Sequence, residues 1–172
     1  MFQYEKYYNE ETKILNLPYF FNQHFDDKLP KNVRQILFSA SSYFNQKVDN
    51  LPVNLTHLTF GVDFNKPVEN LPKSLTHLTF NYKFNQPVDN LPENLINLSF
   101  GVCFNQLINN LPKNLKKLNF SYFSRFNKLI SNLPNKIDIL EFPLLFNNTI
   151  NNISSSLTKL TFRRKFNSII FW

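Results

Sequence analysis

Apolar and polar residues alternate in short stretches that recur along almost the whole chain. In the stretch 57–60, His57 and Thr59 alternate with Leu58 and Phe60, which is the period of a strand with one buried face. The predicted inward pairs are Ile36/Phe38, Leu58/Phe60, Leu78/Phe80, Leu98/Phe100, Leu118/Phe120, Leu140/Phe142 and Leu160/Phe162. The pattern therefore predicts a series of short, half-buried strands.

A Phe-Asn pair follows each predicted strand and marks a repeat. Its phenylalanines are Phe21, Phe44, Phe64, Phe84, Phe104, Phe126, Phe146 and Phe166, at steps of 23, 20, 20, 20, 22, 20 and 20 residues. Self-similarity at a fixed period indicates a repeat architecture, in which each unit buries its apolar face against its neighbours. We therefore predict one solenoid of about seven to eight rungs over residues 12–172, preceded by an N-terminal cap segment at residues 1–11.

The segment that leads from each Phe-Asn pair to the next strand carries further apolar positions and a proline. In one rung Val68 and Leu71 are expected to face inward, and Pro72 follows. Proline lacks an N–H and disfavours helix in the residue before it, so these segments are predicted to be extended or irregular. The predicted fold class is a repeat solenoid similar to leucine-rich repeats, mostly β, with short parallel strands stacked in one sheet and little helix.

The two constant phenylalanine positions of each rung are expected to form two aromatic ladders in the core. The asparagine beside them has both donors and an acceptor, so at a turn it can satisfy backbone groups and bridge to the next rung. The predicted structural ladder comprises the eight phenylalanines of the Phe-Asn pairs and Asn22, Asn45, Asn65, Asn85, Asn105, Asn127, Asn147 and Asn167. A stacking platform for nucleic-acid bases is the alternative role; we favour the core because every rung repeats these residues.

The recurring pattern FNxPVxNLPxxLxxLxF resembles the FNIP repeat, a relative of leucine-rich repeats found in amoebae and in the giant viruses that infect them. The resemblance covers roughly residues 12–172, although residues 152–154 read Asn-Ile-Ser instead of Asn-Leu-Pro. It implies a scaffold for protein interaction. Some FNIP proteins carry an F-box before the repeats, which implies recruitment of substrates to a ubiquitin ligase. Only about eleven residues precede the first rung here, so we expect no F-box.

No group of residues in the sequence has the pattern of a catalytic or metal site. His57 and His77 share an outward position on neighbouring rungs, but zinc needs three or four ligands and the next rung offers Asn97. Cys103 is the single cysteine, has no base indicated beside it, and is predicted to be a structural thiol. We therefore predict a non-enzyme without catalytic residues, metal or cofactor.

The charged residues are distributed unevenly along the chain. Residues 1–102 contain nine Lys/Arg and ten Asp/Glu, whereas residues 103–172 contain ten Lys/Arg and two Asp/Glu. The basic half could merely keep the protein soluble, or it could bind an acidic protein or a nucleic acid, the last on charge alone. The chain has no signal-like start and no apolar run of the roughly 18 residues that a membrane span needs. We expect an intracellular protein, in the host cytoplasm if the gene is viral.

The outward strand positions vary from rung to rung while the inward ones do not, as a tailored contact surface would. The predicted partner-binding residues are Gln35, Leu37, His57, Thr59, His77, Thr79, Asn81, Asn97, Ser99, Lys117, Asn119, Ile139, Glu141, Lys159, Thr161 and Arg163. Charge reversal at Lys117 and Arg163 is expected to abolish binding to an acidic partner and to leave stability within about 0.5 kcal/mol.

Three functions thus remain open. The first is a scaffold that binds a protein on its strand face, in its narrower form as a substrate-recognition module. The second is a binder of nucleic acid or another anionic surface through the basic half, which a steep salt dependence would reveal. The third is a decayed paralogue or truncated copy without a partner. The apolar tail at residues 169–172 has no obvious polar cap, so it either covers the last rung or pairs with another chain.

Overall fold

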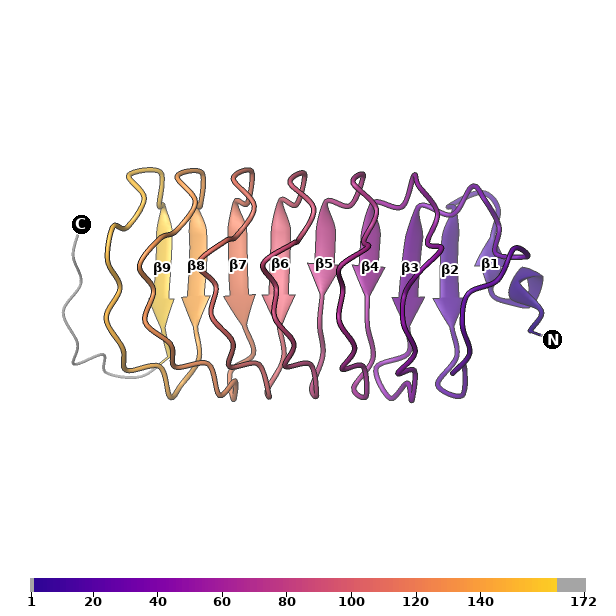
Figure 1. The fold of residues 1–172 in the computed structure, drawn as a ribbon, viewed down its shortest axis with the longest axis horizontal. Coiled ribbons are helices and arrows are strands. Elements are labelled where there is room, and N and C mark those ends of the chain that lie inside the picture. The colour runs from indigo at the N-terminus through magenta and orange to yellow at the C-terminus, as the bar shows by residue number, and fades with distance from the viewer. Residues whose placement is uncertain (1, 164–172) are drawn as a thin grey trace.

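The computed structural model describes residues 2–163, which form one nine-stranded sheet with its strands in sequence order (Figure 1). The elements are the 3-10 helix η1 (Tyr4–Lys6) and the strands β1 (Tyr8–Asn9), β2 (Ile14–Leu17), β3 (Gln35–Phe38), β4 (His57–Thr59), β5 (His77–Thr79), β6 (Asn97–Phe100), β7 (Lys117–Phe120), β8 (Ile139–Phe142) and β9 (Lys159–Phe162). Strands β2 to β9 are all parallel, and irregular segments return behind them. The predicted solenoid is therefore confirmed, and η1 is the only helix within the described residues.

Of the five extra residues in the two longer repeat steps, two lie in the loop that follows β3 and two in the loop that follows β7, and the fifth lies between Phe21 and β3. Each of these loops contains a fully buried serine, Ser42 or Ser124. The Oγ of Ser42 accepts a hydrogen bond from the N–H of Phe44 at 3.2 Å, and Ser124 does the same for Phe126 at 3.3 Å. The extra residues therefore leave the strand register intact.

The N-terminal residues pair with the first rung. Strand β1 runs antiparallel to β2, with Tyr8 opposite Leu15, and the connection between them includes Lys13 at a φ of 58°. Tyr4 of η1 is fully buried at this end of the core. Because β1 belongs to the same sheet as the rungs, the division into a cap at residues 1–11 and a solenoid from residue 12 stays a prediction.

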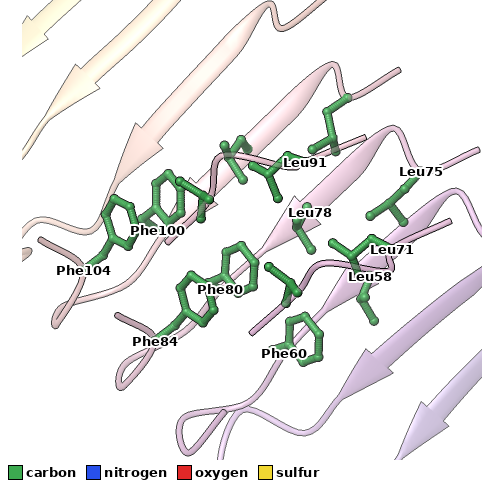
Figure 2. Close-up of a cluster of buried hydrophobic side chains, with 14 of the residues drawn as sticks. Leu58, Phe60, Leu71, Leu75, Leu78, Phe80, Phe84, Leu91, Phe100 and Phe104 are labelled. Atoms are coloured by element: carbon green, nitrogen blue, oxygen red, sulfur yellow. The ribbon is translucent and has the colours of Figure 1, made fainter. Parts of the chain in front are cut away.

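The core lies between the sheet and the return segments (Figure 2). The inward strand residues of β2 to β8 are buried, and so are the Val or Ile and the Leu of the return segments. A further position, two residues before the strand, is fully buried in six rungs and was not part of the predicted core: Val33, Leu55, Leu75, Leu95, Leu115 and Ile137. A turn at the proline places it there, since Leu75 N–H donates to the carbonyl of Pro72 at 3.0 Å.

The phenylalanines of neighbouring rungs stack in two rows. Within one rung, the ring centroids of Phe80 and Phe84 are 3.6 Å apart and the ring planes differ by 8°. Between rungs, the centroids of Phe64 and Phe84 are 6.0 Å apart at 2°. Close face-to-face rings are electrostatically less favourable than offset ones, so burial and the rung spacing hold this arrangement together. Phe166 and Asn167 lie outside the described residues.

The asparagines of the Phe-Asn pairs form a hydrogen-bonded row from rung to rung. The Oδ1 of Asn65 accepts a hydrogen bond from the backbone N–H of Asn85 at 2.9 Å, and Asn85 does the same for Asn105. Equivalent bonds run from Asn22 to Asn45, Asn45 to Asn65, Asn105 to Asn127 and Asn127 to Asn147. The row satisfies backbone donors at a turn and fixes one rung against the next.

Candidate interaction surface

The solvent-facing side of the sheet carries two columns of side chains, because parallel strands in register place equivalent residues side by side. The first column is Ile14, Gln35, His57, His77, Asn97, Lys117, Ile139 and Lys159; the second is Asn16, Leu37, Thr59, Thr79, Ser99, Asn119, Glu141 and Thr161. Asn16 and Lys159 are exposed and the others are half-buried. Asn81 follows Phe80 at the end of β5 and is half-buried, and Arg163 directly follows β9. The structure thus brings the predicted residues onto one continuous face; that a partner binds there stays a prediction.

Two histidines stack near the middle of the first column. The ring centroids of His57 and His77 are 4.0 Å apart, with planes 11° from parallel. Each Nδ1 lies 2.9 Å from the Oγ1 of the preceding threonine, Thr56 or Thr76. Partial burial lowers the pKa of both imidazoles, and the neighbouring His57 lowers the pKa of His77 further.

The stacking geometry of the histidines bears on metal binding. A ring nitrogen binds a metal in the plane of its own ring, and the planes of His57 and His77 are nearly parallel. Their nitrogens therefore do not converge on one point between the rings. Within residues 2–163, no group of three or more His, Cys, Asp or Glu could hold a metal ion. The pair is a polar, half-buried contact of the sheet face.

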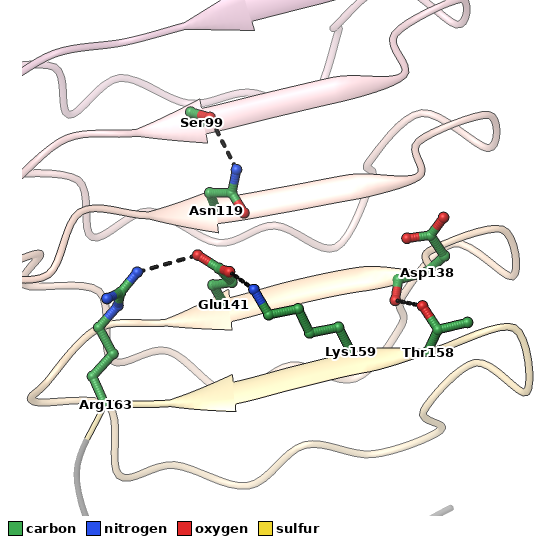
Figure 3. A network of polar contacts seen from close by, with 7 residues as sticks. All are labelled: Ser99, Asn119, Asp138, Glu141, Thr158, Lys159 and Arg163. Carbon is green, nitrogen blue, oxygen red and sulfur yellow. Dashed lines mark hydrogen bonds and ion pairs between the residues drawn. The ribbon is translucent and has the colours of Figure 1, made fainter.

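The C-terminal end of the face carries an ion-pair network around Glu141 (Figure 3). Its Oε1 accepts a hydrogen bond from Lys159 Nζ at 2.6 Å, and its Oε2 accepts one from Arg163 Nη2 at 3.1 Å. The hydrogen bond from Lys159, joined by the charges of Lys159, Arg163 and Lys117, holds the pKa of the carboxyl below its usual range. Two of the cations that the sequence places on this face are thus engaged by one acid. The face presents less free positive charge than the sequence suggests.

Asn119 lies between the network and the polar middle of the face. Its Nδ2 lies 3.5 Å from Ser99 Oγ, and its buried Oδ1 has no hydrogen-bond partner among the described residues (Figure 3). A buried acceptor without a partner costs about 1–3 kcal/mol.

The basic residues of the C-terminal half do not share one face within residues 103–163. Lys113 and Lys136 lie in turns before strands, and Lys136 donates to Asn114 Oδ1 at 2.7 Å. Arg125 lies in the loop after β7, and Lys128 in the following return segment. Charge alone therefore gives little support to nucleic-acid binding, which needs cations that follow a phosphate backbone.

The sequence interpretation missed a row of exposed apolar side chains at one edge of the sheet. These residues lie in the loops that follow the strands and are Tyr19, Phe20, Tyr43, Tyr82, Tyr122, Phe123 and Leu145. The positions differ in residue type from rung to rung and so lie outside the constant pattern. The available signal was the aromatic residue at the second position after the strand phenylalanine, which recurs as Tyr82 and Tyr122.

Stacked parallel strands, one strand per rung of about 20 residues and return segments almost without helix define a β-solenoid of the leucine-rich-repeat-like class. Residues 44–83, 67–101 and 84–123 match the model of the FNIP repeat. The chain thus contains FNIP repeats over residues 44–123, as the sequence pattern indicates. Repeat families of this kind typically mediate protein–protein interactions and are typically non-enzymatic.

A solved structure supports the same fold. The chain is similar to CroV588 of the giant virus CroV, described as a circular LRR protein, with 36% sequence identity and a TM-score of 0.78. The match covers 88% of this chain and 24% of that one, so this chain spans about a quarter of the length of the viral protein. None of the curated proteins matches the chain. In residues 2–163, no helix has the length and apolar character needed to cross a membrane.

Proposed function

We propose that the chain is a non-enzymatic scaffold that binds a partner protein along the solvent-facing side of β2 to β9. The observation that carries this proposal is the pair of continuous side-chain columns. Each rung adds two side chains of its own type to a surface that the sheet holds rigid. With eight parallel strands about 4.8 Å apart, the surface is roughly 34 Å long, enough for the patch that one partner covers in an ordinary interface.

The composition of this face suggests how a partner is recognised. The middle is polar and uncharged, with the histidine stack beside Thr79 and Ser99. Lys117 is half-buried, and its positive charge helps to lower the pKa of Glu141. Lys159 is exposed. We infer a partner with hydrogen-bonding groups over the middle strands and an acidic group near Lys117.

The proposal extends to the setting of the protein. We propose that it acts inside the cell, in the host cytoplasm if the gene is viral. In its narrower form, as a substrate-recognition module, the scaffold holds its partner for a second component that modifies it. The typical role of repeat families of this kind supports the general proposal and leaves the narrower form to experiment.

The test compares the strand face with the back of the solenoid. The face variant is Thr79→Arg with Ser99→Arg, which places two long cations at the centre of the second column. The matched control is Val53→Arg with Leu107→Arg, at positions that are 80% and 53% exposed away from the strand face. Each protein serves as bait in host-cell lysate, with mass spectrometry as readout and equal thermal stability as a precondition. A partner retained by wild type and control but lost by the face variant supports the proposal; equal recovery with the face variant contradicts it.

A further inference from the structure

Two neighbouring rungs have the dipeptide Thr-His where their strands begin: Thr56 with His57, and Thr76 with His77. The two imidazole rings stack at a centroid distance of 4.0 Å, with planes 11° apart. The Oγ1 of each threonine lies 2.9 Å from Nδ1 of the histidine that follows it. Which of the two atoms donates in this contact decides what the rings present to solvent.

The threonine hydroxyls fix the tautomer of both rings. Thr56 Oγ1 donates to the carbonyl of Arg34 at 3.0 Å, and Thr76 Oγ1 donates to the carbonyl of Thr56 at 3.0 Å. A hydroxyl has one hydrogen, and these bonds use it, so each Oγ1 accepts in its contact with the histidine. Nδ1 therefore carries the proton in both neutral rings, and Nε2 carries the lone pair.

Both Nε2 atoms are open to solvent. No hydrogen bond within residues 2–163 reaches either of them, and neither is among the buried polar atoms that lack a partner. Because the ring planes are nearly parallel and each Nδ1 faces its own threonine, the two lone pairs point the same way. The strand face thus presents two hydrogen-bond acceptors side by side on β4 and β5.

The geometry of these acceptors limits which group can bind to both. A carboxylate has no hydrogen to donate. The N–H bonds of an ammonium or a primary amide diverge from one nitrogen atom, whereas the two lone pairs do not converge on one point. A guanidinium is planar and has two parallel N–H bonds along one edge, which match two acceptors that lie side by side.

We propose that the strand face recognises an arginine side chain of its partner, whose guanidinium donates one hydrogen bond to Nε2 of His57 and one to Nε2 of His77. This inference rests on the proposed function and adds the chemistry of one contact. The acidic group of the partner near Lys117 lies two strands further along, roughly 9.6 Å from β5 at about 4.8 Å per parallel strand. The bound segment therefore contains both an arginine and an acidic residue.

Protonation of the histidines reverses the contact. An imidazolium carries a hydrogen on Nε2 as well as on Nδ1, and its charge repels a guanidinium. The neighbours Gln35 and Asn97 are uncharged, Arg34 before β3 and Lys117 on β7 are cations, and no carboxylate lies on the face from β3 to β7. Burial lowers the pKa of both rings. Binding is therefore at full strength above about pH 6.5 and is lost as the pH falls through the lower pKa values of the two histidines.

The first measurement is the tautomer itself. Nitrogen-15 NMR of the full chain with labelled histidine, at about pH 7.5, distinguishes a protonated ring nitrogen from one with a lone pair. The single variants His57→Gln and His77→Gln assign the signals. We expect a proton on Nδ1 and a lone pair on Nε2 in both rings. A proton on Nε2 of either ring at this pH overturns the proposal.

The second measurement is a selection of phage-displayed random 12-residue peptides on the immobilised full chain at about pH 7.5. Selected peptides are synthesised with a fluorophore, and their Kd values are measured by fluorescence anisotropy. The variant His57→Leu with His77→Leu removes both acceptors, and His57→Gln with His77→Gln keeps acceptors that do not titrate. The matched control is His24→Leu, at the exposed third histidine in the return segment before β3. Thermal denaturation checks that each variant is folded.

We expect the peptides to contain an arginine whose replacement by lysine weakens binding about tenfold, because lysine cannot donate two parallel hydrogen bonds. The leucine variant should weaken binding by a similar factor, and His24→Leu should bind as wild type. The Kd of the wild type should rise severalfold between about pH 7.5 and pH 5, and that of the glutamine variant should change little.

The strand-face variant Thr79→Arg with Ser99→Arg separates this inference from the proposed function. Peptides that this variant no longer binds, but that need no arginine or bind the leucine variant unchanged, overturn the inference and leave the proposed function standing. Peptides that bind the strand-face variant as tightly as wild type contradict both. Selection of no peptide, or of acidic peptides that bind more tightly at pH 5, also overturns the inference.

Discussion

At the scale of the residue, Asn85 shows how a side chain that recurs in every rung forms hydrogen bonds between neighbouring rungs. Its backbone N–H donates to Asn65 Oδ1, while its own Oδ1 accepts from the N–H of Asn105 and from Gln106 Nε2 at 3.1 Å. The sequence indicates that such an asparagine bridges rungs, since it recurs at a turn in every unit. It does not indicate which atoms meet, because that depends on how closely two turns approach in space.

Phe84 and Asn85 should contribute differently to stability. Phe84 is fully buried between two neighbouring phenylalanines of its row, so Phe84→Ala should lower the free energy of unfolding by about 3–5 kcal/mol through the cavity it leaves. Asn85→Ala leaves the N–H of Asn105 without its partner and should cost about 1–3 kcal/mol. Urea denaturation measures both, with Leu107→Ala as an exposed control. Equal losses for the two variants would contradict this account.

Substitution of Asn119, in contrast, is expected to raise the free energy of unfolding. Its Oδ1 is buried without a partner, and the adjoining positions in its column are Ser99 and Glu141. Asn119→Thr removes the orphaned carbonyl and introduces a residue that favours strands. We expect the free energy of unfolding to rise by about 1 kcal/mol in urea denaturation. Asn119→Asp should lower it instead, because a second carboxylate would lie beside Glu141, and a rise in that variant would contradict the explanation.

At the scale of the element, the alternation of apolar residues was sufficient to place β3 to β9 and to decide which side of each strand faces the core. It did not predict β1, because two residues at Tyr8–Asn9 contain no measurable alternation. The strand face was predictable for the same reason as the core. Successive residues of a strand point to opposite sides of the sheet, so the alternation that identifies the buried residues also identifies the solvent-facing ones. The aromatic edge was not, because loop residues follow no period and gather only when the rungs stack.

The ion pairs change one expectation about the strand face. Charge reversal at Arg163 would bring an acid beside Glu141, whose side chain is 18% exposed. We therefore expect Arg163→Glu to lower stability by up to about 1 kcal/mol, rather than to leave it unchanged. Lys117→Glu adds a further negative charge at the same carboxyl. Thermal denaturation of the two single variants and of Glu141→Gln measures this, and full stability of Arg163→Glu would show that the network is not formed.

The histidine stack should make β4 and β5 sensitive to mild acid. Partial burial lowers the pKa of His57 and His77 in the folded chain, and the side chains beside them in the column, Gln35 and Asn97, are uncharged. The unfolded chain therefore takes up protons first. The stability that comes from the two neutral histidines is fully present above about pH 6.5, the pKa of an unperturbed histidine. It is lost as the pH falls toward the lower pKa values of His57 and His77 in the folded chain.

The measurement is the urea midpoint as a function of pH. It should fall between about pH 7 and pH 5 in the wild type, and less in His57→Gln with His77→Gln. Loss of the Glu141 ion pairs affects a separate window, below about pH 4.5, because the pKa of that carboxyl is lowered. An identical profile for the glutamine variant between pH 7 and pH 5 would rule out the histidine explanation.

At the scale of the whole molecule, each rung from β3 to β8 contacts the rungs beside it through one strand pair, one step in each of the two phenylalanine rows and one asparagine bond. Such an arrangement is nearly one-dimensional, so stability is close to a sum over rungs and their interfaces. The repeat period is therefore enough to predict the whole architecture from the sequence. It is not enough to predict which surface binds a partner, because the period constrains the buried side chains and leaves the exposed ones free.

Removal of one complete rung tests this description of the molecule. Deletion of residues 84–103 joins Lys83 to Phe104, so Phe104 and Asn105 can take the places of Phe84 and Asn85 beside Phe64 and Asn65. We expect the shortened chain to fold with the same circular dichroism, and the urea m-value to fall by roughly one part in eight, in proportion to the surface buried. Deletion of residues 84–93 removes half a rung, separates a strand from its Phe-Asn pair, and should prevent cooperative folding. If both deletions fold equally well, or if neither folds, the rungs are not the independent units that the repeat indicates.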